Sequence, residues 1–574
     1  MHEQCRMGDR PQAGPIKPAL RQTAVACLSV LILLILPIQP NAQTSAAPMA
    51  YYLDSTAGND SAAGTSPDAA WLTLARASAQ SYQPGDAVLL KAGDRFGGQL
   101  VITSSGSPGQ PLRVDRYGEG PDPIIDGSGD REGGYCAAIL IHNAQHIVIT
   151  NLALTNTLDR PRPGQRHDWS FGIHVINDGG GVLEHFRFER LTIRDIFAAE
   201  LDHTSEDAFN KVVVSGIRFA ATPGPDGAPP AYFRDIVIAE NAIARTGRFG
   251  VQIGHQSGQA RGRDGHTRDP ETGFNRDIVI RDNRFADLGG SAVQLAGARF
   301  ALIENNDFER IGSSLVPARM VGRGSGAWVI NSRDIVAQHN RSHHVRGYKD
   351  SYGLHVDFGN RDVLYQYNLS HDSEGGFVEV LGNNRNIIWR YNISINDGLR
   401  EKDGNTIWLS PWSPDMELSE GIHIYHNTVF VRPGLYPDLD FRARGARIWN
   451  NIFAVSRHAM IGERYRAVLG GGRLELAGNL FFGRVSQQLR NLDGSAVMDD
   501  PLFVDPGSAE AQGYVLAPHS PAIGAGSDIE HPAFPAAGQG VFAHIPEQPA
   551  VDFFGQELPK DVAPTIGAAL SVRR

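Results

Sequence analysis

The chain has 574 residues, which exceeds the usual size of one globular core, so it forms several domains or one elongated repeat. Its hydrophobic fraction of 41% excludes a disordered polymer, and its formal net charge of −10 argues against nucleic acid, which binds basic surfaces. An anionic glycan stays compatible with this charge, because a local basic cleft or bound cations can offset it.

Residues 1–42 have the features of a secretory signal peptide. Lys17 and Arg21 form a positive flank, Val25 to Leu36 form an apolar run, and Pro37 to Ala42 offer a cleavage region. The apolar run is too short for a comfortable membrane span. We therefore expect a secreted or periplasmic protein, monomeric and without a stable membrane span after cleavage.

The next segment, residues 48–130, is predicted to form an N-terminal cap and the first coils. Trp71 to Ala79 is typical of a short amphipathic helix, and Gln83-Pro-Gly-Asp86 is a turn that leads into a strand at Ala87 to Lys91. A helix at the open end of a coil would cover an otherwise exposed hydrophobic edge.

Residues 131–498 contain an irregular repeat, in which a few β-branched residues lead into an asparagine, as in Asp277-Ile-Val-Ile-Arg-Asp-Asn283. From Asn283 onward the asparagines are 23, 34, 28, 24, 35, 24 and 28 residues apart. This spacing is not that of a helical solenoid, but suits coils of short strands with loops inserted at their corners. Alternate residues within each copy are apolar, which also predicts strands. The copies end at Asn241, Asn283, Asn306, Asn340, Asn368, Asn392, Asn427, Asn451 and Asn479.

The asparagine column has a predicted structural role. Asparagines at the same turn of successive coils can hydrogen-bond along the axis and satisfy turn backbone groups that would otherwise be buried unpaired. After the coils, residues 499–574 are rich in Pro and Gly and carry little strand pattern, so we expect an irregular C-terminal tail.

These segments resemble the secreted bacterial right-handed parallel β-helix proteins that share their repeat with pectate lyase-like enzymes. The resemblance covers most of the mature chain and implies an all-β fold, a right-handed parallel β-helix. Three motifs are similar to the alginate lyase and chondroitinase B family, namely Gln83-Pro-Gly-Asp86, Ser105-Gly-Ser-Pro-Gly109 and Pro123-Ile-Ile-Asp-Gly127. That family implies calcium held by acidic side chains, with a Lys and an Arg acting on a uronic acid ring. Where the family has its catalytic lysine, this sequence has Gly382, Asn383 and Asn384, so that base is not carried over.

Two successive coils carry the densest polar cluster. In Gly353-Leu-His-Val-Asp-Phe358, alternation turns His355 and Asp357 outward, and in Gly376-Phe-Val-Glu-Val380 it turns Glu379 outward. Setting Val356 beside Val378 places Asp357 beside Glu379, about 5 Å apart at the backbone. The next coil turns Trp408 outward.

Two like charges on neighbouring strands repel each other, so something must offset this pair. A Ca²⁺ ion bound by Asp357, Glu379 and Glu374 would do so, because calcium prefers several carboxylate oxygens. Proton sharing, which raises the pKa of one carboxyl, is the second possibility. In the third, the acids belong to a solvated surface network with Lys349, Arg346 or Arg385.

The cluster predicts a polysaccharide lyase that acts on an anionic, uronate-containing polymer. Calcium on Asp357 and Glu379 would neutralise the uronate carboxylate, and Lys349 or His355 would take the ring proton beside it. We expect Trp408, Trp412 and Arg346 to bind substrate, the two tryptophans as flat platforms for sugar rings.

Two alternatives stay open, and an epimerase is a further option on the same scaffold. A glycoside hydrolase would use Asp357 and Glu379 as its carboxyl pair, one as general acid and the other as nucleophile or base. A β-helix that binds carbohydrate without catalysis would use the same surface and show no turnover.

Overall fold

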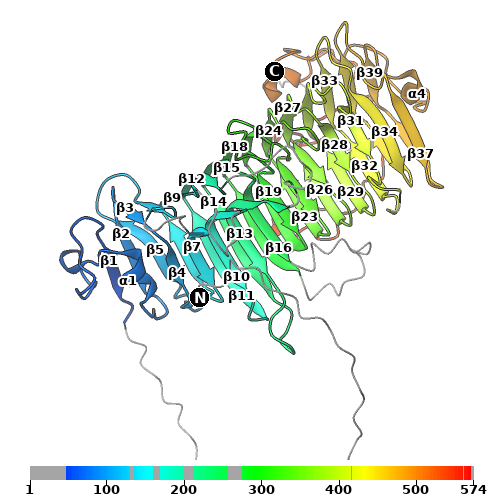
Figure 1. The fold of residues 1–574 in the computed structure, drawn as a ribbon. Coiled ribbons are helices and arrows are strands. Elements are labelled where there is room, and N and C mark those ends of the chain that lie inside the picture. Colours follow the sequence, from blue (N-terminus) through cyan, green and yellow to red (C-terminus); the bar gives the residue numbers. More distant parts are fainter. Residues whose placement is uncertain are drawn as a thin grey trace, which may run out of the picture.

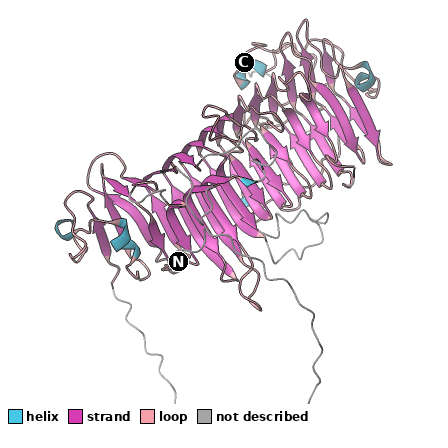
Figure 2. Cartoon of the chain, viewed as in Figure 1, coloured by secondary structure: helices cyan, strands magenta, loops and turns pink. Residues whose placement is uncertain are grey.

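The protein is a right-handed parallel β-helix in which three long parallel sheets surround one core (Figure 1). The computed structural model describes residues 47–129, 135–159, 168–199, 209, 211–255, 274–414, 416–559 and 562–570. Over this part of the chain strands dominate and the few helices are short (Figure 2). The all-β solenoid predicted from the repeat is therefore confirmed.

Each coil contributes one strand to each of three sheets, here called A, B and C. Sheet A contains β1 (Ala50–Leu53), β2 (Ala87–Lys91), β5 (Leu112–Tyr117), β8 (Ile147–Thr150), β11 (Val182–Glu189), β14 (Tyr232–Ala239), β17 (Asn275–Arg281), β20 (Ala298–Glu304), β23 (Arg333–Gln338), β26 (Arg361–Gln366), β29 (Arg385–Arg390), β32 (Glu420–Tyr425), β35 (Ala446–Trp449) and β38 (Leu474–Ala477).

Sheet B contains β3 (Arg95–Gly97), β6 (Ile124–Asp126), β9 (Ala153–Thr157), β12 (Thr192–Phe197), β15 (Ala242–Thr246), β18 (Arg284–Leu288), β21 (Asp307–Ile311), β24 (Arg341–His343), β27 (Leu369–His371), β30 (Ile393–Ile395), β33 (Thr428–Val431), β36 (Ile452–Val455) and β39 (Leu480–Phe482). Sheet C contains β4 (Leu100–Ile102), β7 (Ala137–His142), β10 (Trp169–Asn177), β13 (Val213–Ala221), β16 (Phe249–His255), β19 (Val293–Ala296), β22 (Ala327–Ile330), β25 (Leu354–Val356), β28 (Gly376–Val380), β31 (Asn405–Leu409), β34 (Asp438–Ala443) and β37 (Tyr465–Leu469).

The core is built from inward-facing residues that lie in register from coil to coil. In sheet A, Ile278 pairs with Ala301, which pairs with Ile335 on the next strand, and all three are fully buried. Because side chains alternate between the two faces of a strand, the residues between these positions face outward. One face of each sheet therefore packs the core, while the other can carry a site.

The asparagine column forms the predicted ladder. The backbone N–H and the Nδ2 of Asn368 both donate to Oδ1 of Asn392, at 2.9 and 3.0 Å, and Asn392 donates in the same way to Asn427. The same two bonds link each member from Asn241 to Asn479. The structural role assigned to this column is confirmed.

A short helix covers the first coils, as expected, but it is shorter than predicted. Helix α1 (Leu74–Ser78) begins after Thr73, whose hydroxyl accepts a hydrogen bond from the backbone N–H of Arg76 at 3.1 Å. Leu74 and Ala77 are its buried residues, whereas Trp71 lies before the helix and forms a parallel bridge with Leu53. A 3₁₀ turn, η1 (Pro67–Ala69), precedes it.

The chain after β39 is irregular and packs against the outside of sheets A and B. It contains α4 (Gln487–Arg490), η2 (Ala511–Tyr514) and η3 (Gly540–Phe542). Phe534 and Phe542 join an apolar cluster on the outer face of sheet A, and Tyr514 joins another on sheet B. The two apolar clusters thus join the tail to sheets A and B, and neither of them lies on the outer face of sheet C.

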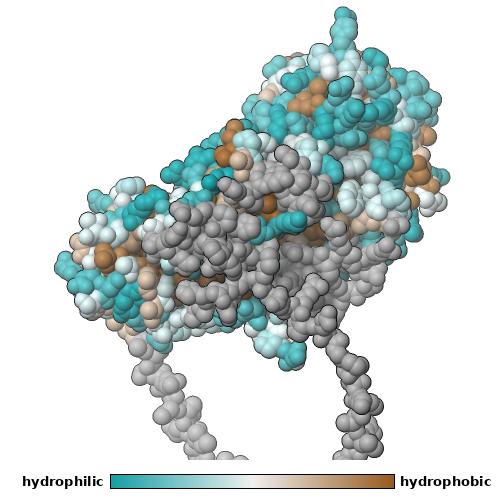
Figure 3. Space-filling model, viewed as in Figure 1, coloured by the Kyte–Doolittle hydropathy of each residue, from teal (hydrophilic) through white to brown (hydrophobic). Residues whose placement is uncertain are grey.

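The predicted signal peptide lies outside the described residues. Among the helices that are described, none has the length and apolarity needed to cross a membrane. On the face of the molecule seen in Figure 3, hydrophilic residues predominate and the hydrophobic patches are small and scattered.

Candidate functional site

The register between β25 and β28 differs from the predicted one. Val356 pairs with Val380, not with Val378, so His355 rather than Asp357 lies beside Glu379, with Nδ1 of His355 3.3 Å from Oε2 of Glu379. A shift of two residues preserves the inward and outward faces of both strands. Alternation of apolar residues could therefore not distinguish the two registers, and the predicted one is wrong.

The corrected register places a mixed row on the outer face of sheet C. Trp328 pairs with His355, and Glu379 pairs with Trp408 on the following strand. The rings of Trp328 and His355 are stacked, with centroids 5.9 Å apart and an interplanar angle of 10°. Asp357 comes directly after β25 and accepts a 2.7 Å hydrogen bond at Oδ2 from Nε1 of Trp328.

A further acid, Asp350, joins this row from the loop before β25. Asp350, His355 and Glu379 each place one ligand-type atom within 4.8 Å of the others. Asp350 and Ser351 have backbone φ angles of +52° and +74°, in the left-handed region that favours glycine. Nη2 of Arg400 stabilises this backbone by donating to the carbonyl of Gly347 at 2.8 Å and to Oγ of Ser351 at 3.1 Å.

The Asp350 carboxylate is paired with a buried arginine. Nε of Arg323 donates to Oδ2 at 2.8 Å and Nη2 donates to Oδ1 at 3.3 Å, which is a bidentate arrangement. The guanidinium also lies 3.9 Å from the ring centroid of Phe209. Burial by itself would raise the pKa of Asp350, but the charge of Arg323 and neighbouring cations hold that pKa below its ordinary value. Asp350 is therefore ionised at neutral pH.

Asp357 has the opposite electrostatic environment. Burial, together with the negative charge of Asp350, raises the pKa of Asp357 to about 7, against the hydrogen bonds from Phe358 and Trp328 that lower it. The Phe358 backbone N–H donates to Oδ1 at 2.8 Å. A carboxyl group with this pKa carries its proton in a large fraction of molecules at neutral pH, and can therefore act as an acid.

Glu379 and His355 lie side by side on neighbouring strands and form a neutral pair. Glu379 is 0% exposed, and within the described part of the chain neither of its oxygens accepts a hydrogen bond. Burial and then the charges of Asp350 and Asp357 raise its pKa well above the ordinary value, so it is protonated. Burial lowers the pKa of His355 to about 4, so its imidazole is neutral.

The burial of the acids excludes the solvated surface network that the sequence left open. Asp357 and Glu379 are both buried, and Arg385 pairs with Glu420 at 3.3 Å. The two acids therefore do not belong to a solvated surface network. Lys349, the predicted base, is exposed on the loop that carries Asp350.

The predicted sugar platforms lie at different depths. Trp408 is partly buried and stacks on Tyr352 with centroids 6.2 Å apart, directly beside Glu379. Trp412 is 54% exposed and lies in the loop after β31. A half-covered indole beside the acids could contact one sugar ring, and the exposed one could contact the next.

Arg346 and Glu374 do not join the acids on sheet C. Nε of Arg346 is 3.8 Å from Oε1 of Glu374, whose other oxygen accepts a 2.9 Å hydrogen bond from the Gly347 backbone N–H. Both side chains line a separate hollow next to the Asp350 loop. Among the described residues, Asp357, Glu379 and Glu374 do not form a group with metal-ligand spacing.

The acidic cluster does not fit the calcium that the lyase resemblance implies. Asp350, His355 and Glu379 offer two carboxylates and one imidazole, whereas Ca²⁺ takes six to eight oxygen ligands. An imidazole with two carboxylates is a donor set that transition metals accept. In addition, Arg323 already compensates the charge of Asp350.

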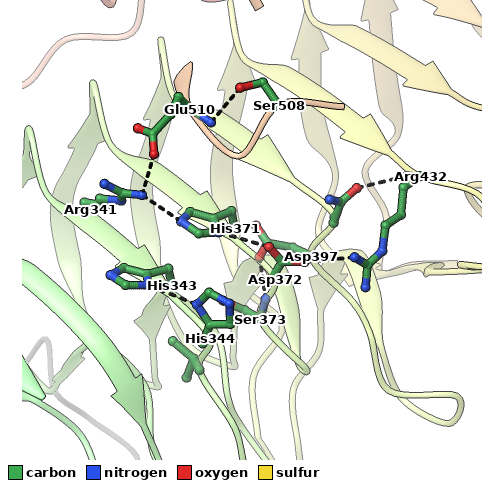
Figure 4. Close-up of polar contacts among 12 residues, drawn as sticks. Arg341, His343, His344, His371, Asp372, Ser373, Asp397, Arg432, Ser508 and Glu510 are labelled. Atoms are coloured by element: carbon green, nitrogen blue, oxygen red, sulfur yellow. Dashed lines mark hydrogen bonds and ion pairs between the residues drawn. The ribbon is translucent and has the colours of Figure 1, made fainter. Parts of the chain in front are cut away.

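A second polar cluster occupies the outer face of sheet B (Figure 4). The rings of His343 and His371 are stacked 5.0 Å apart, and His371 contacts Asp372 at 3.0 Å. Arg341 donates to Glu510 at 3.0 Å, which fastens the C-terminal tail to this face. We interpret this cluster as structural, since its charged groups pair with one another.

Several residues of the site were missed or had no assigned role. Asp350 belongs to a loop without periodicity, so no pattern predicted that it would approach β28. Arg323 lies 27 residues before Asp350 and binds it only in the fold, where Phe209 in turn contacts the guanidinium of Arg323. Of these residues, Trp328 alone could have been found from the sequence. Alternation in Ala327-Trp-Val-Ile330 turns it outward on the strand that precedes the one with His355.

Comparisons with known proteins agree with the fold. Residues 271–434 match the family described as "Right handed beta helix region". A lacto-N-biosidase of Bifidobacterium longum subsp. longum is 24% identical over 495 residues, which cover 71% of this chain and 29% of that protein. The chain therefore spans less than a third of that relative's length.

Among solved structures, a GH136 lacto-N-biosidase from Eubacterium ramulus is similar, with a TM-score of 0.54 and 22% identity over 75% of this chain and 68% of that one. A PL6 family alginate lyase has a TM-score of 0.44 and 13% identity, covering 78% of this chain and 56% of that one. At 22% identity, the likeness to the Eubacterium ramulus structure shows a shared β-helix fold.

Proposed function

We propose that this protein is a secreted glycoside hydrolase in which Asp350 and Asp357 are the catalytic carboxyl groups. The observation that carries the proposal is the divergence of their pKa values. Arg323 keeps the pKa of Asp350 low, whereas burial raises the pKa of Asp357 to about 7. Two nearby carboxyl groups whose environments separate their pKa values are the arrangement that glycosidases use.

Each carboxyl group has a defined role in this proposal. Asp357, protonated and oriented by Trp328, donates its proton to the glycosidic oxygen as the bond breaks. Asp350, ionised and oriented by Arg323, either attacks the anomeric carbon or activates a water molecule that does so. Glu379 is protonated and therefore adds no second negative charge beside Asp350, so the charge available for attack is that of the Asp350 carboxylate.

Two further facts favour a hydrolase over the predicted lyase. The relatives that match over most of this chain are named lacto-N-biosidases, which are glycoside hydrolases. Of the two bases predicted for elimination, His355 is weak, with a pKa of about 4, and Lys349 is exposed. The substrate proposed is therefore a glycan that binds across sheet C, with Trp408 beneath one of its rings.

The test is a panel of oligosaccharides and polysaccharides incubated with the purified mature protein, with and without a chelator. We expect new reducing ends, no ultraviolet-absorbing unsaturated sugar, and no effect of the chelator. Asp350→Asn and Asp357→Asn should each lower kcat/KM by about 10²- to 10⁴-fold.

The matched control is Asp397→Asn. Asp397 is also a buried aspartate whose pKa is raised, to about 6, but it bonds to Ser394 and Ser373 near sheet B. This variant should keep wild-type activity. Unsaturated products, or full activity in both Asp350→Asn and Asp357→Asn, would overturn the proposal.

A further inference from the structure

A hollow of about 690 Å³ lies beside the loop that carries Asp350. Its volume is within the range of pockets that bind small molecules, about 300–1,000 Å³. Arg346, Gly347 and Tyr348 form one wall, and Asp350 follows two residues later in the same loop. The opposite side includes Arg310, Gly312, Ser314, Leu315 and Glu374.

The charged groups in its walls are already compensated. Arg310 donates to Asp287 at 2.6 and 2.8 Å and also pairs with Glu309. Arg346 faces Glu374 at 3.8 Å. A strongly charged ligand would have to break these pairs, whereas an uncharged ligand would not. The hollow is therefore suited to an uncharged molecule.

The remaining lining combines apolar side chains with serine hydroxyls. Tyr348 is 44% exposed and Leu315 is 62% exposed, so both offer surface to a ligand. Gly312, with a φ of +73°, lets the chain pack closely against the next coil, because a Cβ there would lie 1.9 Å from the Arg346 carbonyl oxygen. A flat aromatic face near the exposed Ser314 matches a sugar ring, which has an apolar face and hydroxyl groups at its rim.

The hollow is in contact with the acidic cluster through two arginines. The guanidinium carbon of Arg323 lies 5.7 Å from the centroid of the Tyr348 ring, while its nitrogens bind Asp350. Arg400 holds the carbonyl of Gly347, a residue of the hollow, and the carbonyl of Asp350 at 3.3 Å. Whatever occupies the hollow therefore lies one side chain away from the reacting carboxylate.

We propose that this hollow is a subsite for an uncharged sugar unit of the substrate, with Tyr348 as its stacking platform. The inference rests on the proposed hydrolase function, because it assigns the hollow to a more distant unit of the same glycan. Short substrates fill only the space at Asp350 and Asp357, and longer ones also reach Tyr348.

The experiment compares two substrates, the shortest glycan that the enzyme cleaves and a longer uncharged oligosaccharide that contains it. Tyr348→Ala should lower kcat/KM for the longer substrate by about tenfold, which corresponds to the loss of one aromatic contact, and leave the shortest unchanged. Tyr348→Phe should keep most of the activity. Tyr436→Ala is the control, since Tyr436 is also exposed but bonds to the His458 carbonyl on another loop.

Two kinetic outcomes would overturn the inference. An equal loss on both substrates would mean that Tyr348 only supports Arg323 and the Asp350 loop. No loss on either substrate would mean that the hollow binds no part of the glycan.

If the wild-type protein cleaves nothing, the proposed function fails and the subsite is tested by binding alone, with saturation-transfer NMR on the uncharged oligosaccharides. Binding that Tyr348→Ala removes and Tyr436→Ala keeps would support the subsite. The absence of binding to the wild type, or a preference for uronate oligosaccharides, would refute it.

Discussion

Asp350 and Asp357 are seven positions apart in the chain, yet their surroundings shift the pKa values of the two carboxyl groups in opposite directions. Asp350 has a bidentate arginine partner, whereas Asp357 accepts bonds, among the residues that the structure describes, from the indole of Trp328 and the backbone of Phe358. The negative charge of Asp350 also raises the pKa of Asp357. Each residue thus helps to set the protonation of the other, as coupled acids do.

This coupling predicts a bell-shaped dependence of kcat/KM on pH. As pH rises through about 7, Asp357 loses the proton that it must donate, so the rate falls on the alkaline side. On the acidic side the rate falls only when Asp350 is protonated, below its ordinary pKa of 3.8. Removing the guanidinium with Arg323→Gln should move the acidic limb to higher pH, because burial then raises the pKa of Asp350 without compensation.

The measurement is kcat/KM for one substrate across the pH range in both proteins. Arg323→Lys is the control, since it keeps a positive charge and should shift the acidic limb less. An acidic limb at the same pH in Arg323→Gln would contradict the role given to this ion pair.

At the scale of the elements, the coils are held in register by the asparagine ladder. Asn392 accepts two bonds from Asn368 and donates from Nδ2 to the Tyr365 and Arg390 carbonyls and to Oδ1 of Asn427. All of these groups are buried, where an unpaired polar atom costs about 1–3 kcal/mol. The ladder therefore ties each turn to the next along the whole stack.

Asn392→Ala is expected to lower the free energy of unfolding by about 2–5 kcal/mol, because it leaves several buried partners unsatisfied. Denaturant or thermal unfolding measures this change. Asn491→Ala is the control, because Asn491 is exposed after α4 and should change stability by less than about 0.5 kcal/mol. Equal stabilities for the two variants would contradict the ladder's contribution.

For the molecule as a whole, the irregular tail acts as an outer brace on two of the three sheets. Phe542 is fully buried in a cluster with Leu302, Val336 and Leu364, which belong to three successive strands of sheet A. Those side chains face outward from the coils and would otherwise be exposed to water. The tail therefore makes the outer face of sheet A part of a second hydrophobic layer.

Phe542→Ala should destabilise the protein by about 3–5 kcal/mol, as expected for the removal of a buried aromatic ring. Phe482→Ala is the control, since Phe482 is partly exposed at the end of β39 and should cost less. Thermal unfolding, followed with a dye that binds exposed apolar surface, measures both. An unchanged melting temperature for Phe542→Ala would show that the tail does not stabilise the coils.

The sequence alone was enough to predict the β-helix fold. The Asn-ended repeat, its minimum spacing and its alternation are local properties, and a parallel coil is built from local units that repeat, so each copy predicted the same strand and turn. The ladder followed for the same reason. The candidate site residues Asp357, Glu379 and His355 were also found by alternation, since it is a property of the strand alone.

Tertiary structure decided how those acids are arranged. Registers of neighbouring strands that differ by two residues have identical patterns of buried and exposed positions, so only packing places His355 beside Glu379. Asp350 comes from a non-periodic loop, and Arg323 reaches it across coils. The different pKa values of Asp350 and Asp357 arise from burial and from neighbouring charges, and both depend on how separate coils pack together.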